Sequence, residues 1–411
     1  MASVLTLRSS LWALRQSAWS LSTRTMSSAA GAALSHSEPV SHTTPPPSMP
    51  ARHPKMPPNY EAVTGDLETF DLPTSVSGSR EDQMLGQRLI AAFRRDGILQ
   101  IRIPSMQQNI VDDAFVASKA FFRQPHAEKA ALVDPYSYGG YIASGEEITD
   151  GIADYSEIYT VTKDVAPTDP RFKLPCHGQQ PWPNKTFKDV VNRYMKQLGN
   201  TGDIMLGLAE LGLNIPRGSL TKLSQDGWHH LRVLRFPQNN KTNGKGKDGR
   251  GIGSHTDYGM LVIASQNDVG GLFIRPPYDD EKTQNWAKSA AGVKENDAGW
   301  VFVPPVSNVF TVFPGDMLQY MTNHYLPSTP HKVGLNTTER FAFAYFHEPH
   351  FDSVVKPLPG YNGGQEPTEG IHYGTHFTNM FKRNYPDRVT TQQLLKDGRE
   401  VMLAQPEYRQ E

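Results

Sequence analysis

Hydrophobic residues recur at helical spacing in the first half of the chain and in short runs in the second half. The helical spacing predicts helices over residues 82–95 and 106–123, with a short strand over 97–101 between them. A third, long helix begins after the capping residue Asn184 and ends near Gly212. The apolar stripe of this third helix predicts that one side faces the core; the stripe consists of Phe187, Val190, Val191, Tyr194, Met195 and Leu198.

From residue 231 onward the pattern predicts short strands separated by turns such as Pro314-Gly315-Asp316. The strand-like runs are 231–236, 260–264, 271–274, 300–303, 309–313, 317–320 and 341–346. Two polar stretches, 238–251 and 279–298, are interpreted as loop insertions. This rhythm predicts a mainly β fold with flanking helices, a jelly roll. The predicted domain covers residues 67–395, with its jelly-roll core at about 228–350 and a tail over 396–411.

The N-terminus has a different composition from the rest of the chain. Residues 1–37 contain ten Ser and three Arg but no Asp, Glu or Lys, and Leu7, Leu11, Leu14, Ala18 and Leu21 follow helical spacing. An amphipathic segment rich in Arg and Ser is typical of a mitochondrial transit peptide, the alternative being a disordered tail. Initiation at Met26 would instead yield a cytoplasmic form. Residues 38–66, with eight prolines between positions 39 and 58, are predicted to be a disordered linker.

The charge balance and the cysteine content limit which partners and which kinds of metal site the chain is expected to have. The 41 basic and 42 acidic residues nearly cancel, which gives no reason to expect nucleic acid or an anionic membrane as a partner. No apolar run reaches the roughly 18 residues of a membrane helix. The single cysteine, Cys176, excludes an internal disulfide framework and a thiolate cluster. Small molecules are therefore the expected partners, and any metal site must consist of histidines and carboxylates.

One pair of such ligands is His255 and Asp257. Among 14 histidines a His-x-Asp motif arises by chance about once, and a second copy is present at His350-Phe351-Asp352. In a strand, residues two apart project from one face, so His255 and Asp257 can bind one metal together. His331 lies 76 residues after His255, far enough to return on another strand, whereas His350 has only His372 and His376 after it.

Two histidines and one carboxylate suit iron(II) and leave three coordination positions open, enough for a chelating 2-oxo acid and O2. Zinc is the alternative metal, since the same side chains can hold it. Arg340, nine residues after His331, can bind the far carboxylate of a dicarboxylic co-substrate through two hydrogen bonds. The alternative for Arg340 is a surface ion pair with Glu339.

Several runs resemble the isopenicillin-N-synthase-like branch of the iron(II)/2-oxoglutarate oxygenases. They are His255-Thr256-Asp257-Tyr258-Gly259, Gly315-Asp316, Thr322-Asn323 and residues 328–333. Residues 141–147, 227–230, 232–237, 346–349 and 377–381 resemble the ethylene-forming enzymes of microbes within that family, and the likeness runs from about Leu67 to Gln393. This resemblance implies a double-stranded β-helix that uses iron(II), 2-oxoglutarate and O2, with ascorbate stimulating the reaction.

Two positions depart from the wider family. Ala342 stands where the family usually has Ser after Arg340, and Phe236 stands where it often has Tyr. Both changes are shared with the ethylene-forming branch. They imply a less polar 2-oxoglutarate pocket that relies mainly on Arg340.

In that branch, 2-oxoglutarate either fragments to ethylene or is decarboxylated to succinate while L-arginine is hydroxylated. The resemblance implies that Arg232 lies near the iron. It further implies an arginine pocket made of Glu147, Thr149, Tyr258, Arg383 and Tyr385. Asn384 stands where the branch can carry Cys. Two other hypotheses remain: an ordinary 2-oxoglutarate hydroxylase that forms no ethylene, and a non-catalytic protein that binds arginine or 2-oxoglutarate.

Overall fold

The computed structural model describes residues 63–238, 249–278, 283–288, 293–364 and 370–402. The predicted transit peptide and most of the predicted linker lie outside these residues, as do parts of both predicted loop insertions and most of the predicted tail. Among the described residues, no helix is both long and apolar enough to cross a membrane.

Three long helices confirm the helical predictions for the first half of the chain. They are α1 (Arg80–Asp96), α2 (Gln108–Phe122) and α4 (Lys185–Gly212). Ser79 caps α1 by accepting a hydrogen bond from the Asp82 N–H, and the predicted cap Asn184 accepts one from the Phe187 N–H at the start of α4. The shorter helices are α3 (His126–Ala130), α5 (Asn285–Lys288), α6 (Asp316–Met321), α7 (Tyr373–Asn384), α8 (Val389–Lys396) and α9 (Arg399–Met402).

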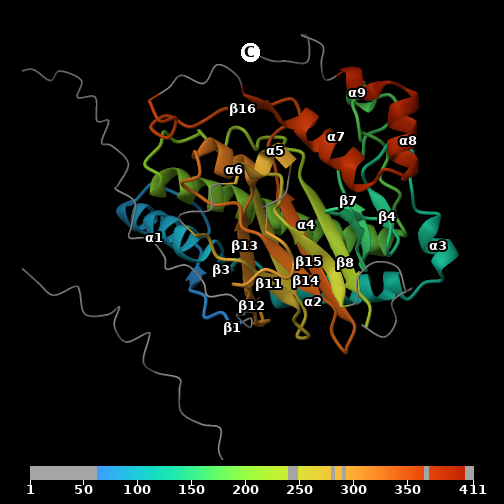
Figure 1. Cartoon of the computed structure of the whole chain (residues 1–411), viewed down its shortest axis with the longest axis horizontal. Coiled ribbons are helices and arrows are strands. Elements are labelled where there is room, and N and C mark those ends of the chain that lie inside the picture. Colours follow the sequence, from blue (N-terminus) through green and yellow to red (C-terminus); the bar gives the residue numbers. More distant parts are fainter. Residues whose placement is uncertain (1–62, 239–248, 279–282, 289–292, 365–369, 403–411) are drawn as a thin grey trace, which may run out of the picture. The chain divides into compact units, whose positions relative to one another are not determined.

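The β structure consists of two main sheets, labelled in Figure 1. The larger has the order β2-β3-β13-β10-β15-β8-β7-β4, and the smaller has the order β1-β12-β11-β14-β9. The larger sheet comprises β2 (Thr69–Asp71), β3 (Leu99–Arg102), β13 (Phe310–Pro314), β10 (Leu261–Gln266), β15 (Arg340–His347), β8 (His230–Phe236), β7 (Glu157–Val161) and β4 (Gly140–Ile142). The smaller comprises β1 (Val63–Thr64), β12 (Val301–Val303), β11 (Leu272–Ile274), β14 (His331–Gly334) and β9 (Arg250–His255).

Two short hairpins complete the strand inventory of the described residues: β5 (Ile148–Thr149) with β6 (Ile152–Ala153), and β16 (Val354–Val355) with β17 (Ile371–His372). The mainly β architecture with helices outside the sheets confirms the predicted jelly roll.

Three sequence predictions were wrong in detail. Residues 317–320, predicted as a strand, form most of helix α6, because an apolar run of four residues fits either element. The polar stretch 238–251 contains the start of β9. The first half also supplies β4 and β7 to the larger sheet, and all five residues of β7 are buried. Burial of both faces removes the alternation that would have indicated a strand.

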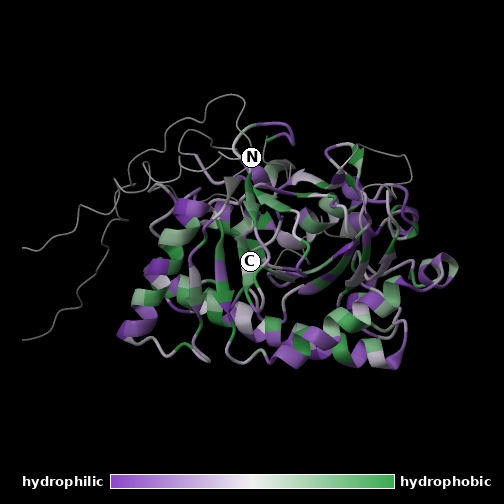
Figure 2. Cartoon of the chain, turned by 90° about the horizontal axis from the view of Figure 1, so that it is seen from below, coloured by the Kyte–Doolittle hydropathy of each residue, from purple (hydrophilic) through white to green (hydrophobic). Residues whose placement is uncertain are grey.

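Helix α4 supports the larger sheet from its outer side. It contacts β10 and β15, where the Tyr194 and Ser265 hydroxyls lie 2.8 Å apart and the Tyr194 ring packs against Phe343. Figure 2 shows the helices carrying both hydrophilic and hydrophobic bands, as expected for helices with one face on the core. Helix α1 packs on α4, so the two helices form an outer layer behind the sheet.

The crossing of α1 and α4 requires glycine. A Cβ added to Gly86 would lie 2.3 Å from the Leu208 carbonyl oxygen and 2.9 Å from the Gly212 nitrogen, both backbone atoms that cannot rotate away. We expect Gly86→Ala to lower the free energy of unfolding by about 1–3 kcal/mol, the usual cost of overpacking. Gly207→Ala is the matched control, because its Cβ would meet Val76 at an ordinary 3.5 Å. Urea unfolding of both variants tests this, and equal stability would contradict it.

Candidate active site

The pairing of strands β9 and β14 brings two histidines together. His331 is the direct cross-strand partner of His255, and the centroids of their rings are 4.2 Å apart. Asp257 lies just beyond the end of β9, with Oδ1 3.8 Å from His255 Nε2 and Oδ2 3.6 Å from His331 Nε2. One ligand atom from each of the three residues lies within 4.8 Å of the others. The structure therefore assembles the predicted triad.

Hydrogen bonds orient both imidazoles in the same way. His255 Nδ1 is 2.8 Å from the Gly253 carbonyl oxygen, and His331 Nδ1 is 3.1 Å from that of Thr329. A carbonyl oxygen can only accept, so each Nδ1 carries the proton and each Nε2 keeps its lone pair for a metal. Burial, together with the neighbouring His331, lowers the pKa of His255 to about 3, so this ring is neutral at pH 7. Two imidazoles and a carboxylate form a donor set that fits iron(II).

Backbone contacts from the 315–317 turn hold Asp257 in place. The Asp316 N–H donates to the Asp257 carbonyl at 2.7 Å, and the Met317 N–H donates to the Gly259 carbonyl at 2.9 Å. The expectation that His255 and Asp257 share one strand face was wrong in detail, because β9 ends at His255. Asp257 reaches the histidines because the first turn of α6 fixes the loop that carries it.

A cavity opens beside the triad, between the two main sheets. Strands β8, β10, β13 and β15 line one side of it, and β9, β11 and β14 line the other. Most of its wall is apolar. The three predicted co-substrate positions Arg340, Phe236 and Ala342 all line this cavity, and so do His255, Asp257 and His331.

Arg340 is the main charge in this apolar wall. It is 4% exposed, lies over the Phe236 ring at 4.8 Å and donates to Gln266 Oε1 at 3.0 Å. Among the described residues, no carboxylate pairs with Arg340, and its Nε has no hydrogen-bond partner. Glu339, the alternative partner, pairs with Arg235 instead. Burial lowers the pKa of Arg340 to about 9, which leaves the guanidinium charged at pH 7.

A second cavity lies beside the triad. His255, Asp257 and Arg232 line both cavities, so two of the three metal ligands stand at their junction. All five predicted arginine-pocket residues line the second cavity, as does Asn384: Glu147, Thr149, Tyr258, Arg383 and Tyr385.

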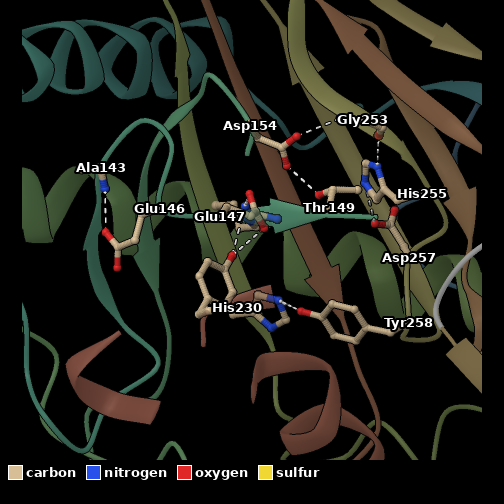
Figure 3. Close-up of polar contacts among 12 residues, drawn as sticks. Ala143, Glu146, Glu147, Thr149, Asp154, His230, Gly253, His255, Asp257 and Tyr258 are labelled. Carbon is tan, nitrogen blue, oxygen red and sulfur yellow. Dashed lines mark hydrogen bonds and ion pairs between the residues drawn. The ribbon is translucent and has the colours of Figure 1, made fainter. Parts of the chain in front are cut away.

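Glu147 is the buried carboxylate of the second cavity, and Figure 3 shows it together with Thr149, His255 and Asp257. Its Oε2 accepts from Arg232 at 2.5 Å and its Oε1 accepts from the Tyr385 hydroxyl at 2.6 Å. Burial alone would lower the pKa of Arg232. The neighbouring Glu147 carboxylate acts in the opposite direction, and the pKa of Arg232 lies well above its usual value. A carboxylate has about four acceptor positions, so Glu147 can still accept from a ligand.

Two hydroxyls of the same cavity already have hydrogen-bond partners. The Thr149 hydroxyl donates to Asp154 Oδ2 at 2.6 Å. The Tyr258 hydroxyl is 3.0 Å from His230 Nε2; since His230 Nδ1 faces the Trp228 carbonyl at 3.1 Å, Tyr258 must be the donor. Both oxygens therefore present lone pairs, which makes this end of the cavity rich in acceptors.

Sequence reasoning missed several residues that support the site. Gln266 orients Arg340, and Asp316 fixes the loop of Asp257. A glutamine that ends an apolar run is a weak signal for Gln266. The sequence marks Gly315-Asp316 as a turn and as part of the family resemblance, but not as a contact of Asp257. His372, one of the two histidines that follow His350, caps helix α7 by accepting from the Thr375 N–H.

Comparison with known proteins decides the family. Residues 228–349 match the 2OG-Fe(II) oxygenase superfamily, and residues 67–185 match the N-terminal domain described as non-haem dioxygenase in morphine synthesis. The 2-oxoglutarate-dependent ethylene/succinate-forming enzyme of Ralstonia nicotianae is 50% identical over 339 residues, 81% of this chain and 96% of the relative. The chain belongs to the 2OG-Fe(II) oxygenase superfamily. It is therefore a 2-oxoglutarate- and iron(II)-dependent dioxygenase.

Other oxygenases share the architecture at lower identity. Homoarginine-6-hydroxylase of Arabidopsis thaliana is 26% identical over 313 residues, 73% of this chain and 89% of the relative. The crystal structure of a putative 2OG-Fe(II) oxygenase family protein from Caulobacter crescentus superposes with a TM-score of 0.62 at 21% identity, covering 78% of this chain and 100% of that one. The rice dioxygenase for auxin oxidation gives 0.57 at 19% identity, covering 79% and 99%.

The assignment of the triad predicts that replacing one of its residues weakens iron(II) binding. His331→Ala removes one of three metal ligands, so we expect iron(II) affinity to fall more than about 100-fold, beyond the effect of losing a supporting residue. Anaerobic calorimetry with iron(II) measures this. His350→Ala is the control, because it belongs to the second His-x-Asp motif and its Nδ1 only accepts from the Asp352 N–H. Comparable losses in both variants would show that the triad is misassigned.

Proposed function

We propose that this dioxygenase converts 2-oxoglutarate to ethylene and succinate, with L-arginine as co-substrate. The observation that carries the proposal is a buried guanidinium without a carboxylate partner, Arg340, in an apolar cavity beside an iron(II) ligand set. The name of the Ralstonia relative describes this pair of products, and the alignment to it covers 81% of the chain.

Arg340 would bind the far carboxylate of 2-oxoglutarate. A buried cation needs an anion, and a guanidinium can donate two parallel hydrogen bonds to a carboxylate. Gln266 holds the Arg340 guanidinium toward the cavity, while the ring of Phe236 covers one of its faces. A dicarboxylate held in this way points its 2-oxo acid end at the triad, since both groups line one cavity.

His255, Asp257 and His331 would hold the iron. When bound, iron(II) supplies the activation of O2 that drives oxidative decarboxylation of 2-oxoglutarate. The apolar residues of the first cavity exclude water from that reaction; they include Val262, Leu272, Phe313, Val333 and Phe346. Ascorbate would keep the iron in its ferrous form.

The second cavity has the charge pattern of an amino acid with a basic side chain. Glu147 and the lone pairs of Thr149 and Tyr258 favour a cationic guanidinium, whereas Arg383 at the exposed edge favours the α-carboxylate. The relative named homoarginine-6-hydroxylase acts, by its name, on a guanidino amino acid, which supports the same ligand class. Substrate bound here lies next to the metal ligands, because His255 and Asp257 line this cavity as well.

Headspace gas chromatography tests the proposal directly. The full chain is incubated with iron(II), ascorbate and 2-oxoglutarate, with and without L-arginine, and ethylene and succinate are measured together. Ethylene that depends on arginine supports the proposal. Succinate without ethylene would favour an ordinary hydroxylase. Binding without either product would favour a non-catalytic binding protein.

Arg340 should control the requirement for 2-oxoglutarate. Arg340→Ala removes a charged, two-point contact of a kind that contributes about 1.5–3 kcal/mol, so we expect the KM for 2-oxoglutarate to rise roughly 10-fold or more. Steady-state succinate formation measures this KM. Arg235→Ala is the control, because Arg235 pairs with Glu157 and Glu339 and does not line the cavity. An unchanged KM in Arg340→Ala would place the 2-oxoglutarate elsewhere.

Glu147 should control the response to arginine. Glu147→Gln keeps the size of the side chain but removes the negative charge, so we expect the KM for L-arginine to rise about 10-fold with iron affinity unchanged. Glu146→Gln is the matched control, because Glu146 is the adjacent carboxylate and binds the Ala143 N–H and Arg388 instead (Figure 3). Equal arginine responses in the two variants would remove Glu147 from the pocket.

We also propose that residues 1–37 direct the protein to mitochondria, on the strength of their Arg- and Ser-rich, acid-free composition. Fusion of residues 1–40 to a fluorescent protein should give mitochondrial fluorescence, and the same fusion begun at Met26 should stay in the cytoplasm. Diffuse fluorescence from the longer fusion would disprove targeting.

A further inference from the structure

A fully buried carboxylate lies between the second cavity and the metal triad without belonging to either. Asp154 follows strand β6 and is 0% exposed. It neither lines the second cavity nor belongs to the three-residue ligand group. Burial of a carboxylate is costly unless its oxygens are fully hydrogen-bonded. The groups that satisfy Asp154 therefore indicate why it is there.

Three donors converge on the Asp154 side chain. The Thr149 hydroxyl donates to Oδ2 at 2.6 Å, while Arg250 Nε and the Gly253 N–H donate to Oδ1 at 2.9 Å and 3.0 Å. Thr149 belongs to the wall of the second cavity, whereas Gly253 belongs to strand β9. Asp154 thus joins the cavity wall to the strand that carries His255.

Gly253 connects Asp154 to the metal ligand His255 through two hydrogen bonds. Its N–H is held by Asp154, and its carbonyl oxygen is the group that orients His255 through Nδ1 at 2.8 Å. Figure 3 shows the sequence of contacts from Thr149 through Asp154 and Gly253 to His255. A shift of Gly253 would turn the imidazole and move its Nε2 away from Asp257.

The backbone of Asp154 also holds the cavity carboxylate. The Asp154 N–H donates to the Glu147 carbonyl oxygen at 3.0 Å, and the Gly145 N–H donates to the Asp154 carbonyl oxygen at 2.8 Å. The position of Glu147, the hydroxyl of Thr149 and the orientation of His255 therefore all depend on one residue.

Arg250 makes this arrangement rigid. Its guanidinium forms ion pairs with both Asp154 and Glu295. It also donates to the Thr149 carbonyl at 2.6 Å and the Ile152 carbonyl at 3.2 Å. It lies so close to Gly253 that an added Cβ would fall 2.2 Å from Nη2. With several partners fixing the guanidinium, neither Arg250 nor Gly253 has room to move.

We propose that Asp154 is a positioning residue that sets the geometry of the second cavity and of the iron ligand His255 at the same time. The identity of the cavity's ligand, L-arginine, rests on the proposed function. Asp154 contacts neither ligand, so it acts through Thr149 on one side and through Gly253 on the other. Loss of a supporting hydrogen bond behind a metal-binding histidine lowers metal affinity by roughly 10- to 100-fold.

Calorimetry on the full chain tests both effects without turnover. Mn(II) is titrated into the metal-free protein, and L-arginine is titrated into the Mn(II)- and 2-oxoglutarate-loaded protein. We expect Asp154→Asn to weaken Mn(II) binding about 10-fold, because loss of the carboxylate charge weakens the hydrogen bonds that hold Arg250 and Gly253. It should also weaken arginine binding, because the new amide donates to the Thr149 hydroxyl and turns that hydroxyl into a donor facing a cation.

Two further variants separate positioning from general destabilisation. Thr149→Val breaks only the cavity side, so it should weaken arginine binding and leave Mn(II) affinity within about 2-fold of the original chain, well below the loss from a broken supporting bond. Glu157→Gln is the matched control, a buried carboxylate that is also bonded to cations, Lys129 and Arg235, but lies away from both sites. Glu157→Gln should lower the melting temperature without changing either affinity.

The outcomes distinguish this inference from the proposed function. If the original chain binds no arginine, the proposed substrate fails and the inference fails with it. If arginine binds but Asp154→Asn keeps both affinities, only the inference fails. Should Asp154→Asn not fold, Gly253→Ala decides, because its Cβ would displace the Arg250 guanidinium that pairs with Asp154. Weaker Mn(II) binding supports the inference, and unchanged Mn(II) binding overturns it.

Discussion

The pairing of strands β9 and β14 is the interaction on which the site depends. It sets His255 directly opposite His331 and leaves Asp257 just past the strand end, within 4 Å of both Nε2 atoms. The same two strands form one wall of the cavity that contains Arg340. Any loss of this register would separate the metal ligands and open the cavity together, because a one-residue slip turns every side chain to the opposite face.

The two cavities beside the triad differ in whether their buried charged side chain has a partner of opposite charge. In the first, Arg340 has no carboxylate partner among the described residues, so a bound dicarboxylate would relieve the cost of its burial. In the second, Glu147 pairs with Arg232, and the hydroxyls of Thr149 and Tyr258 donate to other residues and keep their lone pairs. An anionic co-substrate therefore suits the first cavity and a cationic side chain suits the second. Two of the three metal ligands stand where the two cavities meet.

Much of the support for the site comes from the backbone rather than from residues that contact a ligand. The first turn of α6 holds the Asp257 loop, and Gly253 links the His255 imidazole to the carboxylate of Asp154. These contacts hold the ligands in position, as a preorganised site requires. Helices α1 and α4 add rigidity from outside, where Gly86 lets them approach closely.

The sequence by itself determined the ligand types, the fold class and the long helices, because residue chemistry and local periodicity are visible along the chain. Tertiary structure alone decided that His331 faces His255 across 76 residues and that Glu339 pairs with Arg235, which leaves Arg340 to the cavity. It also decided that residues 317–320 are helical and that Asp154 is buried, with hydrogen bonds to both Thr149 and Gly253. These features depend on partners distant in sequence, and no local pattern records which distant groups will meet.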